Sequence, residues 1–170
     1  FIGLPIMRFP SLAALTALAL PAPALANSGT VSVEIPKQAV RNYRKPYVAV
    51  WIEDSSGKMV KNVVVLHDQA RLANRWLPDL STWWREGGRS MDMPADGISS
   101  PTRAPGRYKF GLSGLNRLSP GKYSLVVEGS REHGGRELVK VPFRIQRGRA
   151  SSGSAKGSRE VGRASGSLRP

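Results

Sequence analysis

Short runs in which apolar and polar residues alternate restrict the fold of this chain more than any other feature. In residues 139–145, VKVPFRI, the side chains of Val, Val, Phe and Ile alternate with those of Lys, Pro and Arg. A period of two residues is typical of a strand with one face buried and the other in solvent. Residues 31–35 alternate in the same way, whereas residues 47–53, YVAVWIE, are apolar on both sides and predict a central strand.

Further short apolar runs extend this pattern along the chain. They occur at residues 60–66, 107–112 and 123–127, with loop signals such as DSSGK and SPGK between runs. About seven short strands without a long helix predict an all-β fold, specifically an immunoglobulin-like antiparallel β-sandwich. Pro142 cannot donate a ladder hydrogen bond, so it predicts either an edge strand or an end of strand pairing. Residues 79–87 predict a short helix or ordered loop that crosses one end of the sandwich.

The N-terminal residues 1–26 have the pattern of a secretory signal peptide. Met7 and an arginine precede a short apolar run, and Ala24 and Ala26 form an A-x-A cleavage signal. The apolar run is shorter than the roughly 20 residues that a membrane-spanning helix needs. We therefore expect export to the periplasm, cleavage after Ala26, and no transmembrane segment in the processed chain.

The C-terminal residues 148–170 differ in composition from the rest of the chain. They consist mostly of Gly, Ser, Ala and Arg, with almost no large apolar side chain. A segment that cannot bury apolar surface does not offset the entropy lost on ordering. The sequence therefore predicts a β-sandwich domain over residues 27–147, followed by a disordered basic tail over residues 148–170.

The chain is strongly basic, with 26 Lys and Arg against 12 Asp and Glu and a formal net charge of +14. Such a surface attracts anionic partners through its long-range field. For an exported protein, these partners are lipid head groups, acidic glycans or acidic protein surfaces rather than nucleic acid. We therefore expect an envelope protein or an anionic surface as partner, while a solvated surface without a specific partner is the alternative.

No catalytic constellation is visible in the sequence, and we expect a protein that is not an enzyme. The chain has no G-x-S-x-G elbow, phosphate-binding loop, dinucleotide-binding fingerprint or zinc-ligand spacing, and it contains no cysteine. A metal site for copper or iron is the alternative, because His67, His133, Met91 and Met93 could converge in the folded chain. The two methionines equally suit gap-filling beneath a loop. Apart from this metal site, no cofactor is expected.

Two adjacent tryptophans are a candidate binding surface. Trp83 and Trp84 are followed by an arginine, and aromatic rings with a nearby guanidinium can stack on a sugar or a partner. In the other interpretation, one tryptophan plugs the open end of the sandwich while its neighbour stays half exposed. Burial of an aromatic ring stabilises a fold strongly, which favours this second interpretation.

Residues 126–138, VVEGSREHGGREL, predict a β-hairpin between two strands. The glycine pair of this run supplies the positive φ angles that a tight turn needs. A plain turn does not require an arginine, a glutamate and a histidine together. The best candidates for contact with a ligand are therefore the three residues at the hairpin tip, Arg131, Glu132 and His133.

Four motifs in a fixed order resemble a known family. They are YVAVWIED, RWLPDLSTWWR, SPTRAPGRYKF and GKYSLVVEGSREHGGRELVKVPF, at residues 47–54, 75–85, 100–110 and 121–143. Together they resemble the bacterial predicted periplasmic proteins grouped as domain of unknown function 2271. This resemblance implies no activity, substrate or catalytic residue. The second half also resembles the immunoglobulin-like domain of flagellar hook-capping proteins.

The sequence therefore predicts an exported, non-catalytic β-sandwich of unknown biochemical role that serves as a binding or accessory module in an envelope process. The alternative is a metal-handling or redox accessory protein, related to copper or iron, that uses histidine and methionine ligands. The family resemblance bears on this alternative, because family members occur among iron-uptake and flavin-related envelope proteins.

Overall fold

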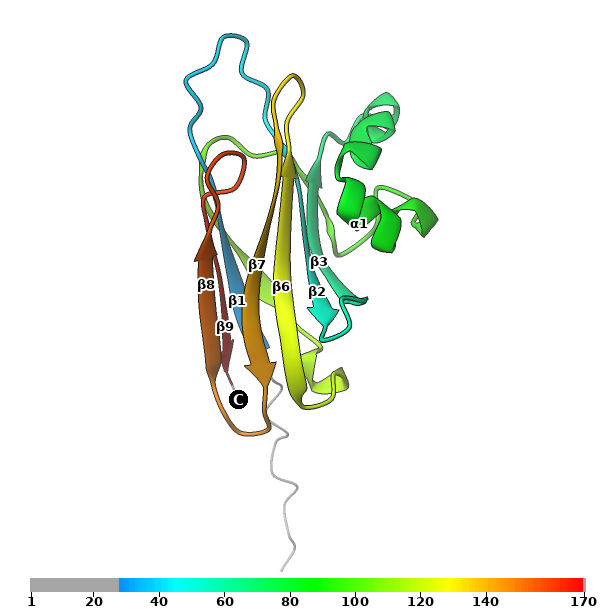
Figure 1. Cartoon of the computed structure of the whole chain (residues 1–170). Coiled ribbons are helices and arrows are strands. Elements are labelled where there is room, and N and C mark those ends of the chain that lie inside the picture. Colours follow the sequence, from blue (N-terminus) through cyan, green and yellow to red (C-terminus); the bar gives the residue numbers. More distant parts are fainter. Residues whose placement is uncertain (1–27, 170) are drawn as a thin grey trace, which may run out of the picture.

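In a computed structural model, which describes residues 28–169, the chain folds into two β-sheets packed face to face (Figure 1). The smaller sheet has the strand order β5–β1–β9–β8 and contains β1 (Ser28–Ile35), β5 (Gly106–Leu112), β8 (Ser151–Lys156) and β9 (Arg163–Arg169). The larger sheet has the order β4–β3–β2–β6–β7 and contains β2 (Tyr47–Asp54), β3 (Met59–His67), β4 (Ser99–Pro101), β6 (Gly121–Ser130) and β7 (Arg136–Ile145). The predicted signal peptide, residues 1–26, lies outside the described residues.

Strand pairing confirms the predicted all-β sandwich. Neighbouring strands are antiparallel, except that the short β4 runs parallel to β3. β7 forms one edge of the five-stranded sheet, which confirms the edge position expected from Pro142. The finer immunoglobulin-like assignment stays a prediction.

The core between the sheets follows from the two-residue alternation along each strand. Its buried side chains from β1, β2 and β6 are Val31, Val33, Ile35, Val48, Val50, Ile52, Leu125 and Val127. β2 is also buried on its other side, because Ala49 and Trp51 pack into a second cluster on the outer face of the five-stranded sheet. The run that is apolar on both sides is therefore the central strand that its sequence predicts.

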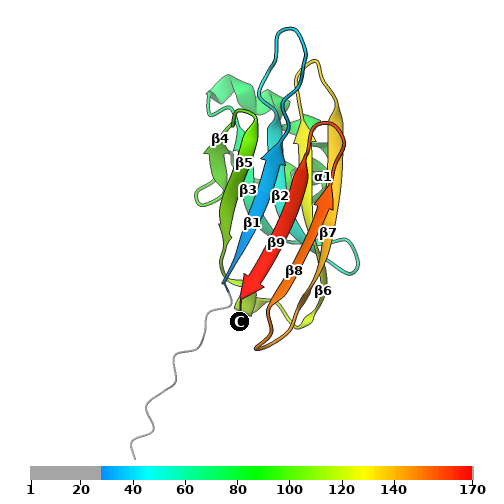
Figure 2. The ribbon, with the colours of Figure 1, turned by 90° about the vertical axis from the view of Figure 1, so that its left-hand side faces the viewer.

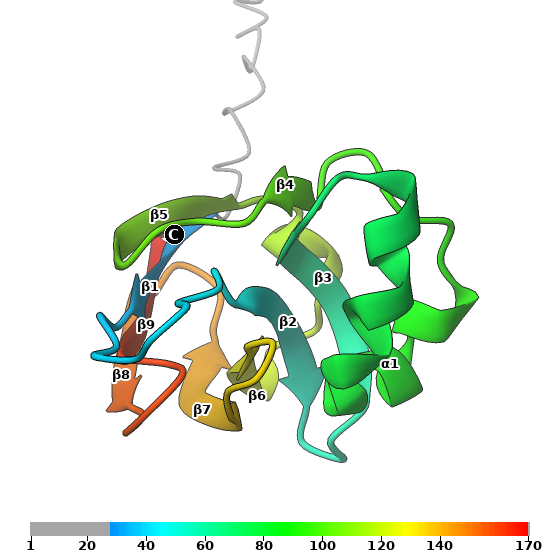
Figure 3. The ribbon, with the colours of Figure 1, turned by 90° about the horizontal axis from the view of Figure 1, so that it is seen from above.

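The segment between β3 and β4, residues 68–98, forms a helical layer over the outer face of the five-stranded sheet, which Figure 3 shows from above. It contains the 3-10 helix η1 (Arg71–Asp79), the α-helix α1 (Ser81–Glu86) and the 3-10 turn η2 (Gly88–Ser90). The helix expected near residues 79–87 is confirmed. Its expected position across one end of the sandwich is wrong. The helix lies instead on the outer face of the five-stranded sheet, where it covers the apolar side chain of Trp51. No helix within residues 28–169 is long and apolar enough to cross a membrane.

The C-terminal residues form strands, so the prediction of a disordered tail over residues 148–170 is wrong. β8 pairs with β9, and β9 pairs with β1 inside the four-stranded sheet. Ala164 and Leu168 of β9 are buried in the core. Gly153 of β8 lies so close to β7 that a Cβ atom there would be 2.6 Å from the carbonyl oxygen of Pro142. The small residues that suggested disorder permit this close packing, and the domain extends to residue 169.

Candidate functional site

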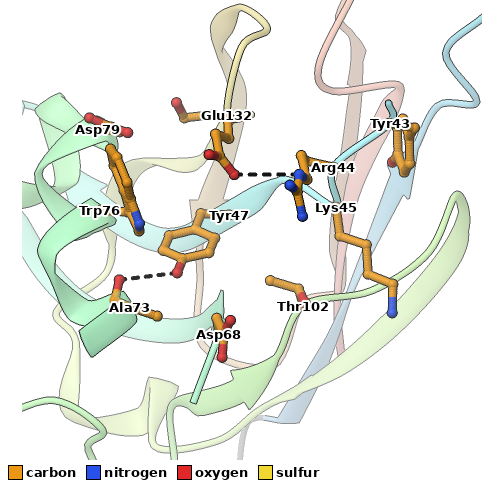
Figure 4. A pocket seen from close by; sticks show the side chains of 11 residues that line it. Tyr43, Arg44, Lys45, Tyr47, Asp68, Ala73, Trp76, Asp79, Thr102 and Glu132 are labelled. Carbon is orange, nitrogen blue, oxygen red and sulfur yellow. Dashed lines mark hydrogen bonds and ion pairs between the residues drawn. The ribbon is translucent and has the colours of Figure 1, made fainter. Parts of the chain in front are cut away.

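A pocket of about 380 Å³ opens at one end of the sandwich, where three segments meet (Figure 4). These segments are the loop before β2, the helix η1 and the hairpin between β6 and β7, which lie at the upper end of the molecule in Figure 1. The residues that line the pocket are Tyr43, Arg44, Lys45, Tyr47, Asp68, Ala73, Trp76, Asp79, Thr102, Ser130 and Glu132. Aromatic and charged side chains therefore dominate its wall.

Two aromatic rings from different elements form one side of this pocket. Tyr47, the first residue of β2, donates a hydrogen bond from its hydroxyl to the carbonyl oxygen of Ala73 in η1, at 3.1 Å. Burial raises the pKa of the Tyr47 hydroxyl, so this group stays protonated and continues to donate. Trp76 of η1 is 41 % exposed, and the guanidinium of Arg75 lies 5.1 Å from the centroid of its ring. The pocket thus pairs a fixed tyrosine with a half-exposed tryptophan.

Charged groups of both signs surround these rings. Glu132 and Arg44 point toward each other in Figure 4, with Oε2 and Nε separated by 3.7 Å. Both side chains are well exposed, so this ion pair contributes little to stability and can open for a ligand. Asp68 and Asp79 add two carboxylates to the lining. The pocket can therefore both accept and donate hydrogen bonds.

The three candidate residues of the hairpin tip point in different directions. Arg131 is only 8 % exposed and donates hydrogen bonds of 3.0 and 3.1 Å to the carboxylate of Glu160, in the loop between β8 and β9. Glu132 lines the pocket, and it also lines a shallower hollow of about 340 Å³ that reaches Arg131 and His133. His133 is exposed, and its Nε2 atom lies 3.6 Å from Glu132. Of the three predicted residues, only Glu132 lines the pocket.

The glycine pair of the hairpin has a different role from the one predicted. The positive φ angle lies at His133, at 56°, and not at Gly134 or Gly135. A Cβ atom on Gly134 would lie 2.5 Å from the guanidinium carbon of Arg131, so this glycine gives Arg131 the room to reach Glu160. The expectation of positive φ angles at the glycine pair is therefore wrong, and the requirement for glycine is steric at Gly134.

The two adjacent tryptophans do not form the predicted surface platform. Trp83 is fully buried between the helical layer and the sheet, and its indole N–H donates to Asn62 at 2.8 Å. Trp84 is partly buried against the same cluster, with its ring centroid 6.3 Å from that of Trp83. The exposed tryptophan is Trp76, which the sequence analysis missed. The adjacent Arg75, in the motif RWLPD, was the signal that could have identified it.

The four candidate metal ligands have different surroundings in the structure. His67 is fully buried, with Nδ1 2.8 Å from the carbonyl oxygen of Asp68, and burial lowers the pKa of its imidazole. The thioether sulfur of Met91 accepts a hydrogen bond from Asn62, and Met93 packs against the cluster beneath the helical layer. His133 stands exposed on the hairpin. Within residues 28–169, no group of three or more His, Cys, Asp or Glu side chains could hold a metal ion.

His67 also contacts a serine, but this pair does not have the features of a hydrolytic site. Its Nε2 atom lies 3.3 Å from the hydroxyl of Ser99 in β4, whose oxygen also accepts the backbone N–H of Ala95 at 2.7 Å. A backbone carbonyl, rather than a carboxylate, orients the ring from the other side. The imidazole is fully buried and lines none of the pockets described above. We interpret this contact as a clamp that holds β4 against β3.

Comparison with known proteins places these features in a family. A family model described as predicted periplasmic protein (DUF2271) matches residues 28–163. The match spans the five-stranded sheet, the helical layer and the whole pocket lining, and it ends at the first residue of β9. No curated protein and no solved structure matches the chain.

Proposed function

The chain belongs to the DUF2271 family of predicted periplasmic proteins, and from this premise we propose that it is an exported, non-catalytic binding module. Export is supported by the description of the family and by the signal-peptide pattern of residues 1–26. The ligand occupies the pocket at the end of the sandwich. The observation that carries this proposal is the half-exposed ring of Trp76 beside Tyr47.

The chemistry of the pocket supports a saccharide as the ligand. The exposed indole of Trp76 offers an apolar face, and a sugar ring presents C–H groups that can pack against such a face. Three carboxylates and two cations line the pocket, so their charges nearly cancel and favour a neutral ligand over a strongly charged one. These groups also supply the acceptors and donors that several hydroxyl groups require.

The lining also supports binding rather than catalysis. It includes the hydroxyls of Thr102 and Ser130 but no histidine, and a serine or threonine nucleophile needs an adjacent base. The carboxylate of Glu132 is paired with Arg44 at 3.7 Å. We therefore propose that a saccharide is bound here and is not cleaved.

We would test this proposal by NMR titration of the chain from Asn27 onward with oligomers of N-acetylglucosamine and of glucose. The expected result is a perturbation of the indole signal of Trp76. This signal is assigned by its absence from the spectrum of the variant Trp76→Ala. In that variant the affinity should fall about fivefold, because aromatic contacts contribute on the order of 1 kcal/mol.

The matched control is Leu72→Ala, which removes a side chain that is 77 % exposed on the same helix η1 but outside the pocket. This variant should bind like the unchanged protein. The proposal is wrong if no oligomer perturbs Trp76 or Tyr47, or if Trp76→Ala binds as tightly as Leu72→Ala. Cleavage of a bound oligomer during the titration would contradict the non-catalytic role.

A further inference from the structure

The two outer faces of the sandwich differ in how residues 28–169 cover them. The helical layer lies on the five-stranded sheet, whereas no segment of the described residues crosses the outer face of the four-stranded sheet in Figure 2. Along its strands, the residues between the buried positions point outward. We call the surface that these outward residues form the open face.

The open face combines small hydroxyl side chains with cations. Its hydroxyl residues are Thr30, Ser32, Ser152, Ser154, Ser165 and Ser167. Its charged residues are Arg107, Lys109, Lys156, Arg163, Arg169 and one acid, Glu34. The face therefore has five positive charges against one negative charge and no large apolar side chain.

Strand register arranges these residues in rows across the sheet. Ser32 of β1 lies between Lys109 of β5 and Ser165 of β9, and Ser165 is paired in turn with Ser154 of β8. The next row places Thr30 between Gly111 and Ser167 in the same way. With strands about 4.8 Å apart, four strands give a surface about 14 Å wide without a protruding side chain at its centre.

The single carboxylate of the open face is already engaged by its neighbours. Glu34 accepts the backbone N–H of Arg163 at 3.1 Å and lies 3.6 Å from the guanidinium of Arg107. The backbone hydrogen bond from Arg163, followed by the charge of Arg107, lowers the pKa of Glu34. Within residues 28–169, no carboxylate forms an ion pair with Lys109, Lys156 or Arg169. These three cations can therefore interact with an external anion.

We propose that the open face docks on the surface of an anionic lipid bilayer. A stable protein interface has a buried apolar and aromatic centre, which this face does not have. The face also has no exposed aromatic ring on which a single glycan chain could stack. Small hydroxyl groups allow a sheet to approach a plane of phosphate groups closely, and the surrounding cations complement the charge of that plane.

The charge of the opposite side favours the same orientation. The helical layer contains four arginines and five aspartates and glutamates between residues 68 and 98, so it is slightly negative. A field that is positive on one side and weakly negative on the other turns the open face toward an anionic surface. In this orientation, the pocket at the end of the sandwich does not lie between the protein and the membrane. This inference concerns a different surface from the pocket, so either proposal can fail without the other.

The test is cosedimentation of the chain from Asn27 onward with lipid vesicles. Phosphatidylcholine vesicles are compared with vesicles in which one lipid in three is phosphatidylglycerol. We expect binding to the second kind only, and we expect it to weaken as salt is added. The triple variant Lys109→Ser, Lys156→Ser and Arg169→Ser should reduce the partition coefficient on the order of 100-fold, since each basic residue near an anionic surface contributes roughly fivefold.

The matched control removes three exposed arginines from the helical layer: Arg71→Ser, Arg85→Ser and Arg89→Ser. Both triple variants have the same net charge, but the control keeps every cation of the open face, so it should bind within a few-fold of the unchanged protein. Equal losses in the two variants would overturn the proposal, because net charge alone would then explain the binding. Absence of binding to phosphatidylglycerol vesicles would overturn it too, as would capture of the protein by soluble heparin under conditions in which vesicles do not bind.

A site-specific probe can determine the orientation, because the chain contains no cysteine. An environment-sensitive dye on Ser154→Cys, an exposed position of the open face on the edge strand β8, should change its emission when phosphatidylglycerol vesicles are added. The same dye on Asp92→Cys, an exposed position in the helical layer, should not respond. A response from Asp92→Cys without one from Ser154→Cys would show that the protein binds through the wrong face for this proposal.

Discussion

Two segments pack against the five-stranded sheet, and they are attached to it by different forces. The helical layer, residues 68–98, covers the outer face of this sheet. The C-terminal hairpin, β8 and β9, lies beside its edge strand β7 and completes the other sheet. The helical layer buries large apolar side chains, whereas the hairpin relies on strand pairing and on hydrogen bonds to carboxylates. The comparison shows that segments of very different composition can both pack into the same fold.

The helical layer is attached mainly by apolar contacts around Trp83. This side chain packs with Trp51 of β2 in a cluster that is buried on all sides. Polar contacts also support the layer, and in one of them the fully buried carboxylate of Glu128 accepts the backbone N–H groups of Thr82 and Trp83, at 3.1 and 2.8 Å. A carboxylate from the sheet thus caps the first turn of α1, which has no side-chain cap of its own.

In addition to strand pairing, two carboxylates attach the hairpin. Glu137 of β7 accepts the backbone N–H groups of three residues in the loop between β8 and β9, which are Ser158, Arg159 and Val161. In the same loop, Glu160 accepts hydrogen bonds from Arg131 and from the N–H of Gly135 at 3.0 Å. Each carboxylate therefore joins this loop to the hairpin between β6 and β7.

The largest expected effect comes from removing the centre of the helical layer. Trp83→Ala should lower the free energy of unfolding by about 4 kcal/mol, because it deletes a fully buried aromatic side chain and leaves a cavity. Urea unfolding followed by circular dichroism measures this change. Trp84→Ala is the control, since the ring of Trp84 is only partly buried and should cost clearly less. Equal losses for the two variants would contradict the apolar attachment described here.

A smaller effect is expected from breaking the ion pair that holds the hairpin. Glu160→Ala leaves the guanidinium of Arg131 nearly buried without a counter-charge, which should cost about 3 kcal/mol. Amide hydrogen exchange should show the loss first in β8 and β9, while β2 and β6 stay protected. Replacing both partners, Arg131→Met with Glu160→Leu, should recover most of the stability. Uniform loss of protection across both sheets would contradict a local role for this pair.

The difference between the two attachments explains which parts of the fold the sequence could predict. Alternation along β1 and β7, and apolar residues on both sides of β2, identified these strands because burial of apolar side chains leaves a local pattern. The same principle predicted disorder for residues 148–170, because they have almost no large apolar side chains, and this prediction was wrong. Their order depends on carboxylates far away in the sequence and on glycines such as Gly153, where only a small residue fits against β7. Neither feature can be predicted from the amino-acid composition of the segment.

The candidate site was harder to predict for a related reason. Its wall combines Tyr47 from β2, Trp76 from η1 and Glu132 from the hairpin, and only the folded chain brings these residues together. Glu132 was identified because charged residues at a turn stood out in a short run. Trp76 was missed because a single tryptophan in an irregular segment has no periodic neighbours that reveal its exposure. Trp83 and Trp84 attracted attention as a pair, although Trp83 belongs to the core.

The smallest expected effect is a dependence of stability on pH. It distinguishes the two attachments, because carboxylates titrate and buried tryptophans do not. Partial burial opposes ionisation of Glu137, but the N–H groups of Val161, Ser158 and Arg159 outweigh it and lower its pKa from 4.5 to about 2. Since the folded state holds this proton less tightly than the unfolded state, the stabilisation is complete above pH 4.5 and is lost as the pH falls toward 2. Glu137→Gln should cost about 2 kcal/mol at pH 7, and the difference in stability from the unchanged protein should shrink across this window.

Urea unfolding at a series of pH values measures this difference directly. Asp92→Asn is the matched control, because Asp92 is exposed and its loss should leave the dependence on pH almost unchanged. Trp83→Ala should lower stability by a similar amount at every pH at which the protein folds, since its contribution does not involve a proton. If Glu137→Gln instead costs the same at pH 3 as at pH 7, the ionised carboxylate is not what holds the C-terminal hairpin. Strand pairing with β1 and the buried side chains of β9 would then account for the attachment of the hairpin.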